Sequence, residues 1–191
     1  QSIAVLTPRN GRYVLAVIDL RSRKPRVVAS DPDWDISNPQ WVNNQRLIFS
    51  LSKGSDVVAE ENLGGGLFAV NIDGSNFRKL VPTIKEAQAG NISYKSYRVL
   101  KRLTDGSNDL LVVDNARGRD AILGASDVYR LDTVSGRTKL LTFNNPGKVT
   151  GWLLDHTNVI RVAVANDVEP TNKRIRQTVY HRDNEQAEWK V

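Results

Sequence analysis

The chain has no cysteine and no methionine among its 191 residues. Without cysteine there are no disulfides, no thiolate metal sites and no cysteine nucleophiles. No apolar run approaches the roughly 20 residues that span a bilayer, so we expect no membrane span. The first residues lack the basic start and long apolar stretch of a signal peptide. We therefore expect any targeting signal to lie upstream of Gln1.

Sequence motifs for catalysis are also missing. There is no Gly-x-Ser-x-Gly nucleophile motif, and the two histidines, His156 and His181, lie in or beside predicted turns, which favours exposed residues over triad bases. Leu63-Gly64-Gly65-Gly66 has no following Lys-Ser or Lys-Thr and precedes a strand. We interpret it as a flexible loop rather than a phosphate site. The sequence predicts no catalytic residue and no cofactor.

Charge is not concentrated in any one part of the chain. The net charge is +6, with Lys and Arg scattered, and no basic face or reading motif predicts a nucleic-acid partner. Asp31, Asp33 and Asp35 place three carboxylates at alternate positions, which makes them weak candidates for calcium ligands. The rest of a calcium loop is absent. We favour a solvated connection with Trp34 packing inward, and predict no metal site.

The composition is that of a folded globular chain, with 40% hydrophobic and 25% charged residues. Apolar residues alternate with a period of two, which predicts strands. Polar turn pairs such as Asn43-Asn44, Asp73-Gly74 and Ser135-Gly136 separate these strands. Only Thr83–Ala89 and Asp56–Leu63 could form short helices. The sequence therefore predicts an all-β chain.

A strand–turn–strand unit recurs along the chain. Aligning the copies places Asp19, Asp73 and Asp132 at one position. In two copies the unit is preceded by a hairpin whose first strand carries a tryptophan, Trp41 or Trp152. Because these tryptophans recur at the same place, packing between repeats is a better account than a stacking platform for a sugar or peptide, which remains a weaker alternative.

Four strands to a unit is the size of a propeller blade. We predict one partial β-propeller domain over 1–191, made of about four four-stranded antiparallel blades. The blades are expected at about 1–30, 34–82, 96–143 and 147–191, and the first lacks its innermost strand. A lone blade cannot bury both of its faces, so neighbouring blades must stack on it.

Long connections are expected at one end of the blades. They fall between the second and third strands of a blade, or between blades, and in a propeller both kinds emerge on the same face. Elaboration of one face is typical of a binding surface. The long connections are 52–66, 82–95, 115–125 and 165–174.

Several runs resemble the amino-terminal propeller of bacterial prolyl oligopeptidase-family serine peptidases, and also TolB-like repeats. The runs are Val17–Leu20, Pro39–Phe49, Gly66–Ser75, Val128–Asp132 with Ser135–Arg137, and Val179–Asp183. The resemblance implies a carboxy-terminal α/β-hydrolase domain, absent from this sequence, that carries the catalytic triad. It also implies that the propeller gates access for peptide substrates, docks on that domain, and belongs to a periplasmic or secreted bacterial protein.

Two functions follow from these observations. The first is the non-catalytic propeller portion of such a peptidase. The alternative is a stand-alone TolB-like scaffold for protein–protein interaction. In either case an open set of blades exposes unpaired edges and apolar faces, so we expect self-association of the chain, as a homodimer through those surfaces.

Overall fold

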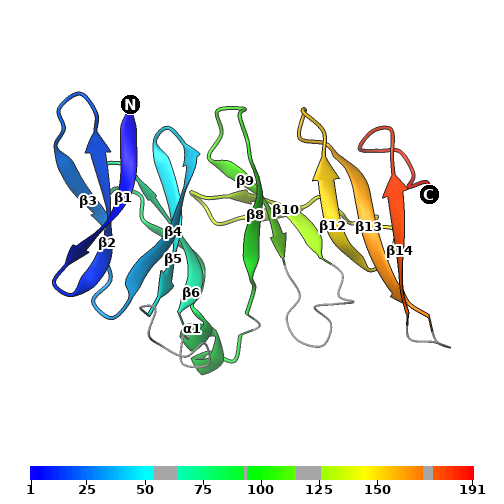
Figure 1. The fold of residues 1–191 in the computed structure, drawn as a ribbon, viewed down its shortest axis with the longest axis horizontal. Helices are drawn as coiled ribbons and strands as arrows, with labels where there is room; N and C mark the ends of the chain where they lie inside the picture. The colour runs from blue at the N-terminus through cyan, green and yellow to red at the C-terminus, as the bar shows by residue number, and fades with distance from the viewer. Residues whose placement is uncertain (54–63, 93, 115–125, 170–173) are drawn as a thin grey trace. The chain divides into compact units, whose positions relative to one another are not determined.

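The computed structural model describes residues 1–53, 64–92, 94–114, 126–169 and 174–191. Its strands form four antiparallel sheets, each built from consecutive strands (Figure 1). The first sheet contains β1 (Ser2–Arg9), β2 (Arg12–Asp19) and β3 (Pro25–Ala29). The second contains β4 (Asp35–Asn43), β5 (Arg46–Ser52), β6 (Gly65–Asn71) and β7 (Arg78–Val81).

The third sheet contains β8 (Tyr97–Arg102), β9 (Asp109–Asp114), β10 (Asp127–Asp132) and β11 (Thr138–Leu140). The fourth contains β12 (Val149–Leu154), β13 (Ile160–Val168) and β14 (Ile175–His181). The prediction of an all-β chain of propeller-type antiparallel sheets, with an incomplete first sheet, is confirmed. The fourth sheet is also short of one strand, because its outermost strand is reduced to the single bridge between His181 and Lys190.

The chain divides into two compact units. Unit 1 comprises Gln1–Tyr94, Arg102–Leu110 and Leu131–Arg137, and unit 2 comprises Lys95–Lys101, Leu111–Arg130 and Thr138–Val191. The third sheet contributes segments to both.

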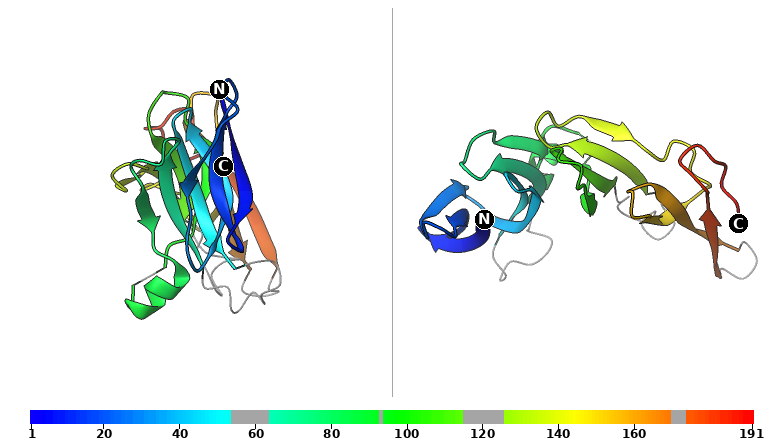
Figure 2. Two further views of the ribbon diagram at one scale, coloured as in Figure 1. Left: turned by 90° about the vertical axis from the view of Figure 1, so that its left-hand side faces the viewer. Right: turned by 90° about the horizontal axis from the view of Figure 1, so that it is seen from above.

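In unit 1 the first sheet packs face to face on the second, as the right-hand view of Figure 2 shows. Leu15 and Val17 of β2 belong to the same buried cluster as Leu47 and Phe49 of β5, and all four are at most 5% exposed. Burial of such side chains stabilises the fold by about 1.5–3 kcal/mol each. The stacking that a blade needs is therefore present between these two sheets. The buried cluster is Leu15, Val17, Val28, Ala29, Ile36, Leu47, Phe49, Leu51, Phe68 and Val70.

In unit 2 the fourth sheet is tied to the segment that leads into β10. The Ser126 N–H and hydroxyl both donate to the Val149 carbonyl, at 2.8 and 2.9 Å, and the Trp152 indole donates to the Ser126 carbonyl at 2.8 Å. The Trp189 ring lies 5.9 Å from that of Trp152, and Arg182 stacks over it at 4.6 Å. These contacts pin the C-terminal segment to the fourth sheet.

One backbone hydrogen bond recurs in all four sheets and defines equivalent positions. The donors are Leu20, Ile72, Thr133 and Arg182, and the respective acceptors are Gln1, Gln45, Asn108 and Arg161. Counting back from these donors, the residue equivalent to Asp19 and Asp132 is Asn71. The alignment that placed Asp73 there was wrong by two positions, because the β6–β7 turn is built differently from the other two. The same register places Trp41 opposite Leu47 and Trp152 opposite Ala163 at equivalent positions.

Local chemistry explains several boundaries. Asn10 and Gly11 both have positive φ, 52° and 76°, as required in a two-residue hairpin loop. The single described helix, α1 (Ile84–Ala89), begins at Thr83, whose side chain and that of Glu86 form a capping box. This confirms the helix predicted at Thr83–Ala89. The helix predicted at Asp56–Leu63 lies entirely outside the described residues.

Two expectations about loops were wrong. β13 continues to Val168, into the segment expected as a loop from Ala165, because its backbone pairs with β14 as far as Val168 opposite Ile175. The side chains of Asn166 and Gln177 also bond across the two strands at 3.2 Å. Gly65 and Gly66 open β6 with φ of 73° and 70° and are packed closely against other residues, so they are not a flexible loop. Of the long connection expected at 52–66, residues 54–63 lie outside the described residues, as does all of the one expected at 115–125.

Candidate functional site

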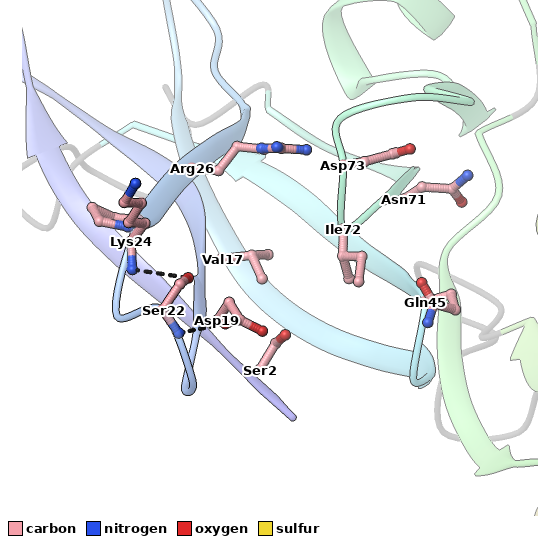
Figure 3. A pocket seen from close by; sticks show the side chains of 11 residues that line it. Ser2, Val17, Asp19, Ser22, Lys24, Arg26, Gln45, Asn71, Ile72 and Asp73 are labelled. Carbon is pink, nitrogen blue, oxygen red and sulfur yellow. Dashed lines mark hydrogen bonds between the residues drawn. The ribbon is translucent and has the colours of Figure 1, made fainter.

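A polar hollow of about 570 Å³ lies at one end of unit 1. Three turns border it, those joining β2 to β3, β4 to β5 and β6 to β7. Figure 3 shows Lys24 and Arg26 on the first-sheet side and Asn71, Ile72 and Asp73 on the second-sheet side. The hollow therefore lies where two stacked sheets present their hairpin turns.

Carboxylates in this hollow are engaged in shaping the turns. Asp19 Oδ1 accepts from the backbone N–H groups of Arg21 and Ser22 at 3.1 and 2.7 Å. The hydrogen bonds from Ser22 hold the pKa of Asp19 below its usual value. Asp73 behaves in the same way, with the hydroxyl and N–H of Ser75 lowering its pKa. Both acids are therefore charged and locally satisfied, which suits recognition rather than proton transfer.

A second hollow of about 700 Å³ adjoins the first and shares Ser2, Asp19, Gln45 and Ile72 with it. It adds the aromatic ring of Trp41 and the cation of Arg102. The combined surface offers amides, hydroxyls, both signs of charge and an indole. Among the described residues that line the two hollows there is no histidine. These groups can donate and accept hydrogen bonds, form ion pairs and stack on a ring.

Sequence reasoning did not find this site. It placed the binding surface at the end of the long connections, whereas these hollows are bordered by short hairpin turns. The signal available was the aspartate that ends a strand and opens a turn, and we treated that residue only as a mark of the repeat. Asp19 lines the same hollow as Gln45 and Arg102 only because the sheets that carry these residues pack together.

The three weak metal candidates do not converge. Asp31 Oδ1 accepts the backbone N–H groups of Asp33 and Trp34, at 2.9 and 3.0 Å. Asp35 is buried at the start of β4 and accepts from the Tyr13 N–H at 2.8 Å. Asp31 and Asp35 are therefore used in the backbone connection between the first two sheets. Within the described ranges, no group of three His, Asp or Glu residues is placed to hold a metal ion.

Both histidines are exposed. His156 occupies the β12–β13 turn, and His181 ends β14, where its backbone pairs with Lys190. A triad base must lie beside a serine and a carboxylate in a sheltered site, and neither histidine lines the hollows.

One further cluster, in unit 2, brings a cation against two tyrosines. The Lys95 ammonium lies 5.7 Å from the centroid of the Tyr97 ring and 5.4 Å from that of Tyr129. Its hydrogen bond with the Tyr97 hydroxyl, at 3.4 Å, raises the pKa of Lys95, and burial raises the pKa of Tyr129. Because Lys95 itself is the cation that lies over the two tyrosine rings, we assign this cluster to local packing.

Comparisons with known proteins add a fold likeness and no family. No family model matches the chain, and no curated protein matches it. Its structure is similar to the crystal structure of TolB from Acinetobacter baumannii, with a TM-score of 0.45 and 14% sequence identity. The alignment covers 100% of this chain and 40% of that chain. In the part of the chain that the structure describes, no helix has the length and apolar character to cross a membrane.

Proposed function

We propose that the chain is a non-catalytic section of a β-propeller that binds other protein surfaces. The observation that carries the proposal is that, among the residues that the structure describes, no other sheet of the same unit covers one apolar face of the first sheet and one of the last. Each of these faces is equivalent, in the repeat, to a face that another sheet covers in unit 1. The natural occupant of each is therefore a further blade of the same kind.

The uncovered face of the first sheet is lined by aliphatic side chains. Ile3 pairs with Ile18, Val5 with Ala16, and Ala16 with Val27. Ile3 is 48% exposed and Val27 36%. Ala16 and Ile18 are equivalent to Phe68 and Val70, which the first sheet covers in the second. Ile3 and Val27 are the exposed members of this face, whereas Ala16 is 2% exposed, and exposed apolar side chains of this kind mark an interaction surface.

The uncovered face of the fourth sheet is similar. Leu153 pairs with Val162, and Val164 with Val179; Leu153 is 59% exposed and Val179 52%. The opposite face of the sheet holds the buried Trp152. Val179 is equivalent to Val17, which is 5% exposed where the second sheet covers it. The uncovered face of the fourth sheet therefore corresponds to the Val17 face of the first sheet, and the uncovered face of the first sheet corresponds to the Phe68 face of the second. These are the two kinds of face that pack together in unit 1.

In its more specific form, we propose that the parent protein is a prolyl oligopeptidase-family serine peptidase. Its blades would dock on a carboxy-terminal α/β-hydrolase domain and limit access for peptide substrates, in the periplasm or outside a bacterial cell. The runs Val17–Leu20, Pro39–Phe49 and Gly66–Ser75 support this through their resemblance to that family. The alternative is a stand-alone TolB-like scaffold. Sequencing the reading frame downstream of Val191 separates the two, since only the peptidase has a Gly-x-Ser-x-Gly motif there.

The purified chain is expected to show no peptidase activity. Among the described residues no histidine lines either hollow of unit 1, so chromogenic aminoacyl and peptidyl substrates should be released no faster than in buffer. Release that depends on the chain and is blocked by a serine-directed inhibitor would contradict the non-catalytic assignment.

The isolated chain is expected to self-associate head to tail, with the fourth sheet of one copy on the first sheet of another. Val179→Glu places a charge in the centre of this contact and should shift dimerisation to at least tenfold higher concentration, measured by sedimentation velocity. Gln186→Glu adds the same charge at an exposed site outside the face and should leave dimerisation unchanged. A wild-type chain that stays monomeric at high concentration would refute the proposal.

A further inference from the structure

A buried guanidinium joins two neighbouring turns of unit 1. Arg46 begins β5, one residue after Gln45, which accepts the recurrent backbone hydrogen bond. Its cross-strand partner is Asn71, whose Oδ1 accepts from Arg46 Nη1 at 2.8 Å. The Nε and Nη2 atoms of Arg46 donate to the hydroxyl and carbonyl of Thr133 in the β10–β11 turn, at 2.9 and 2.6 Å. The space between these two turns is therefore filled by the end of an arginine side chain.

The hollow of about 570 Å³ lies at the equivalent place between the turns of the first two sheets. Three of its lining residues correspond, in the register of the recurrent hydrogen bond, to the three residues that this contact joins. The equivalent pairs are Ser2 and Arg46, Asp19 and Asn71, and Ile72 and Thr133. Figure 3 shows Ser2 beside Asp19 on the first-sheet side and Ile72 on the second-sheet side. The short side chain of Ser2 does not fill the space that Arg46 fills in the next contact.

The hollow retains acceptors for a guanidinium. Asp19 has a carboxylate in the place of the Asn71 amide, and a carboxylate accepts more hydrogen bonds than the two that the backbone of its own turn donates. The Ile72 carbonyl corresponds to the Thr133 carbonyl, whereas the Thr133 hydroxyl has no counterpart. Within the described residues, no lysine or arginine forms an ion pair with Asp19. A planar fork of charged N–H donors matches this pair of acceptors.

Two cations line the hollow without taking this place. Figure 3 shows Arg26 directed towards Asp73. The hydrogen bonds from Ser75 hold the pKa of Asp73 below its usual value, and the charge of Arg26 adds to this effect. Lys24 lies well away from Ile72 in the same view. The carboxylate of Asp19 is therefore the charge that an incoming cation would meet beside Ile72.

The arginine belongs to the second sheet rather than to the repeat as a whole. The equivalent residues of the third and fourth sheets are Asp109 and Val162. The first sheet shares with the second the position of the acceptors and adds a negative charge through Asp19. The occupant of the hollow follows from those acceptors and not from a recurring residue.

The turn that leads into β5 takes no part in holding the guanidinium. Asn43 of that turn donates to the Ser107 carbonyl and to Asn108 Oδ1, at 3.0 and 2.7 Å. Arg46 is instead held by residues that follow it in the chain. The corresponding groups of the hollow also lie at Ser2 or after it, so the inference needs nothing that precedes β1.

We propose that this hollow binds the guanidinium group of an arginine side chain that a partner protein presents. The inference rests on the proposed function and names the chemistry that a partner would bring to this end of the blades. The guanidinium donates to the Asp19 carboxylate and the Ile72 carbonyl, as Arg46 donates to Asn71 and Thr133. Because the hollow is open to solvent and salt, a single guanidinium should bind in roughly the millimolar range, with the rest of the partner surface supplying further affinity.

The probe is the capped tripeptide acetyl-Gly-Arg-Gly-amide, titrated into the isotopically labelled Val179→Glu chain, in which copies are kept apart. NMR should show saturable shifts of the backbone amides of Asp19, Ser22 and Ile72. The tripeptide with citrulline, which has the same shape but no charge, should bind at least about tenfold more weakly. The tripeptide with lysine lacks the planar fork and should bind about threefold more weakly. Equal affinities for the arginine and citrulline tripeptides would show that no guanidinium is recognised.

Protein variants supply the matched test. Asp19→Asn keeps the oxygen that its own turn requires but removes the charge, and should weaken the arginine tripeptide about tenfold. Asp33→Asn makes the same change at an exposed residue that lines neither hollow and should leave binding unchanged. Ser2→Arg places the chain's own guanidinium at the position equivalent to Arg46 and should abolish binding, whereas Ser2→Ala leaves the hollow open and should bind normally.

Four results would overturn the inference. They are the absence of saturable binding, equal losses in Asp19→Asn and Asp33→Asn, wild-type binding by Ser2→Arg, and agmatine binding more than about tenfold tighter than the tripeptide, which would indicate a small guanidinium ligand. If Asp19→Asn weakens dimerisation of the wild-type chain, the arginine comes from a second copy and the assignment to a different partner is overturned. Head-to-tail dimerisation that Val179→Glu disrupts, without tripeptide binding, leaves the proposed function standing and removes only this inference.

Discussion

Replacing Arg46 by methionine is expected to lower the free energy of unfolding by about 3–5 kcal/mol. The Arg46 side chain is 1% exposed, and it links three parts of unit 1. Its Nε and Nη2 donate to the hydroxyl and carbonyl of Thr133 at 2.9 and 2.6 Å. Its Nη1 donates to Asn71 Oδ1 at 2.8 Å and to the Asn76 carbonyl at 3.1 Å.

The size of this effect follows from what methionine leaves behind. Methionine fills a similar volume but donates nothing, so the buried hydroxyl and carbonyl oxygens of Thr133 lose the donor that replaces water, and the more accessible oxygens of Asn71 and Asn76 also lose a charged donor. Burial lowers the pKa of Arg46 and the Asp132 carboxylate raises it, so the guanidinium stays charged and its hydrogen bonds are charge-assisted. Because the chain's total stability is on the order of 5–15 kcal/mol, this loss threatens the packing of the β10–β11 turn.

Arg78→Met is the matched control. Arg78 reaches the same turn through one exposed hydrogen bond, Nη2 to the Ser135 carbonyl at 2.7 Å, and its loss should cost less than about 1 kcal/mol. Urea unfolding followed by tryptophan fluorescence measures both variants. Arg46→Met within about 1 kcal/mol of the wild type would show that the buried guanidinium is not what joins these turns.

Gly66→Ala is expected to destabilise the chain by about 2–4 kcal/mol. Gly66 has φ of +70°, where a side chain is strained. A Cβ there would also lie 3.0 Å from the Val81 carbonyl oxygen and 3.2 Å from the Thr83 nitrogen. Both neighbours are backbone atoms at the entry to α1, so neither yields without moving the strand or the helix.

Gly11→Ala separates strain from crowding. Gly11 has φ of +76°, and a Cβ there would meet nothing within 4 Å. Its substitution should therefore cost only the conformational part, about 1 kcal/mol. Equal losses in the two variants, measured by thermal unfolding, would mean that the contact with Val81 and Thr83 contributes nothing.

Most of the secondary structure could be predicted because its causes are local. Alternating apolar residues mark the strands, Asn10-Gly11 permits a tight hairpin, and Thr83 with Glu86 caps α1. The recurrence of Trp41 and Trp152 was also readable, and both stand at equivalent positions of the repeat. These features need only neighbouring residues or a comparison of one copy with the next.

Errors arose where a residue's role depends on distant segments. Gly65 and Gly66 looked like a flexible loop until Tyr94 and Val81 were placed against them. Asn166 looked like a loop residue until its strand partner Gln177 was known. The hollow near Asp19 was missed because its walls come from turns of two sheets.

By itself, the sequence determined an all-β chain of repeated antiparallel units with an incomplete first copy, because strand periodicity and turn chemistry act over a few residues. Only the tertiary structure decided which side chains the units use to hold one another. Arg46 shows the reason: it reads as one more scattered charge, yet its hydrogen-bond partner Thr133 lies 87 residues along the chain. A guanidinium can be buried only where the fold places enough hydrogen-bond acceptors around it to replace water. Those acceptors come from different sheets, so they are brought together only when the sheets pack.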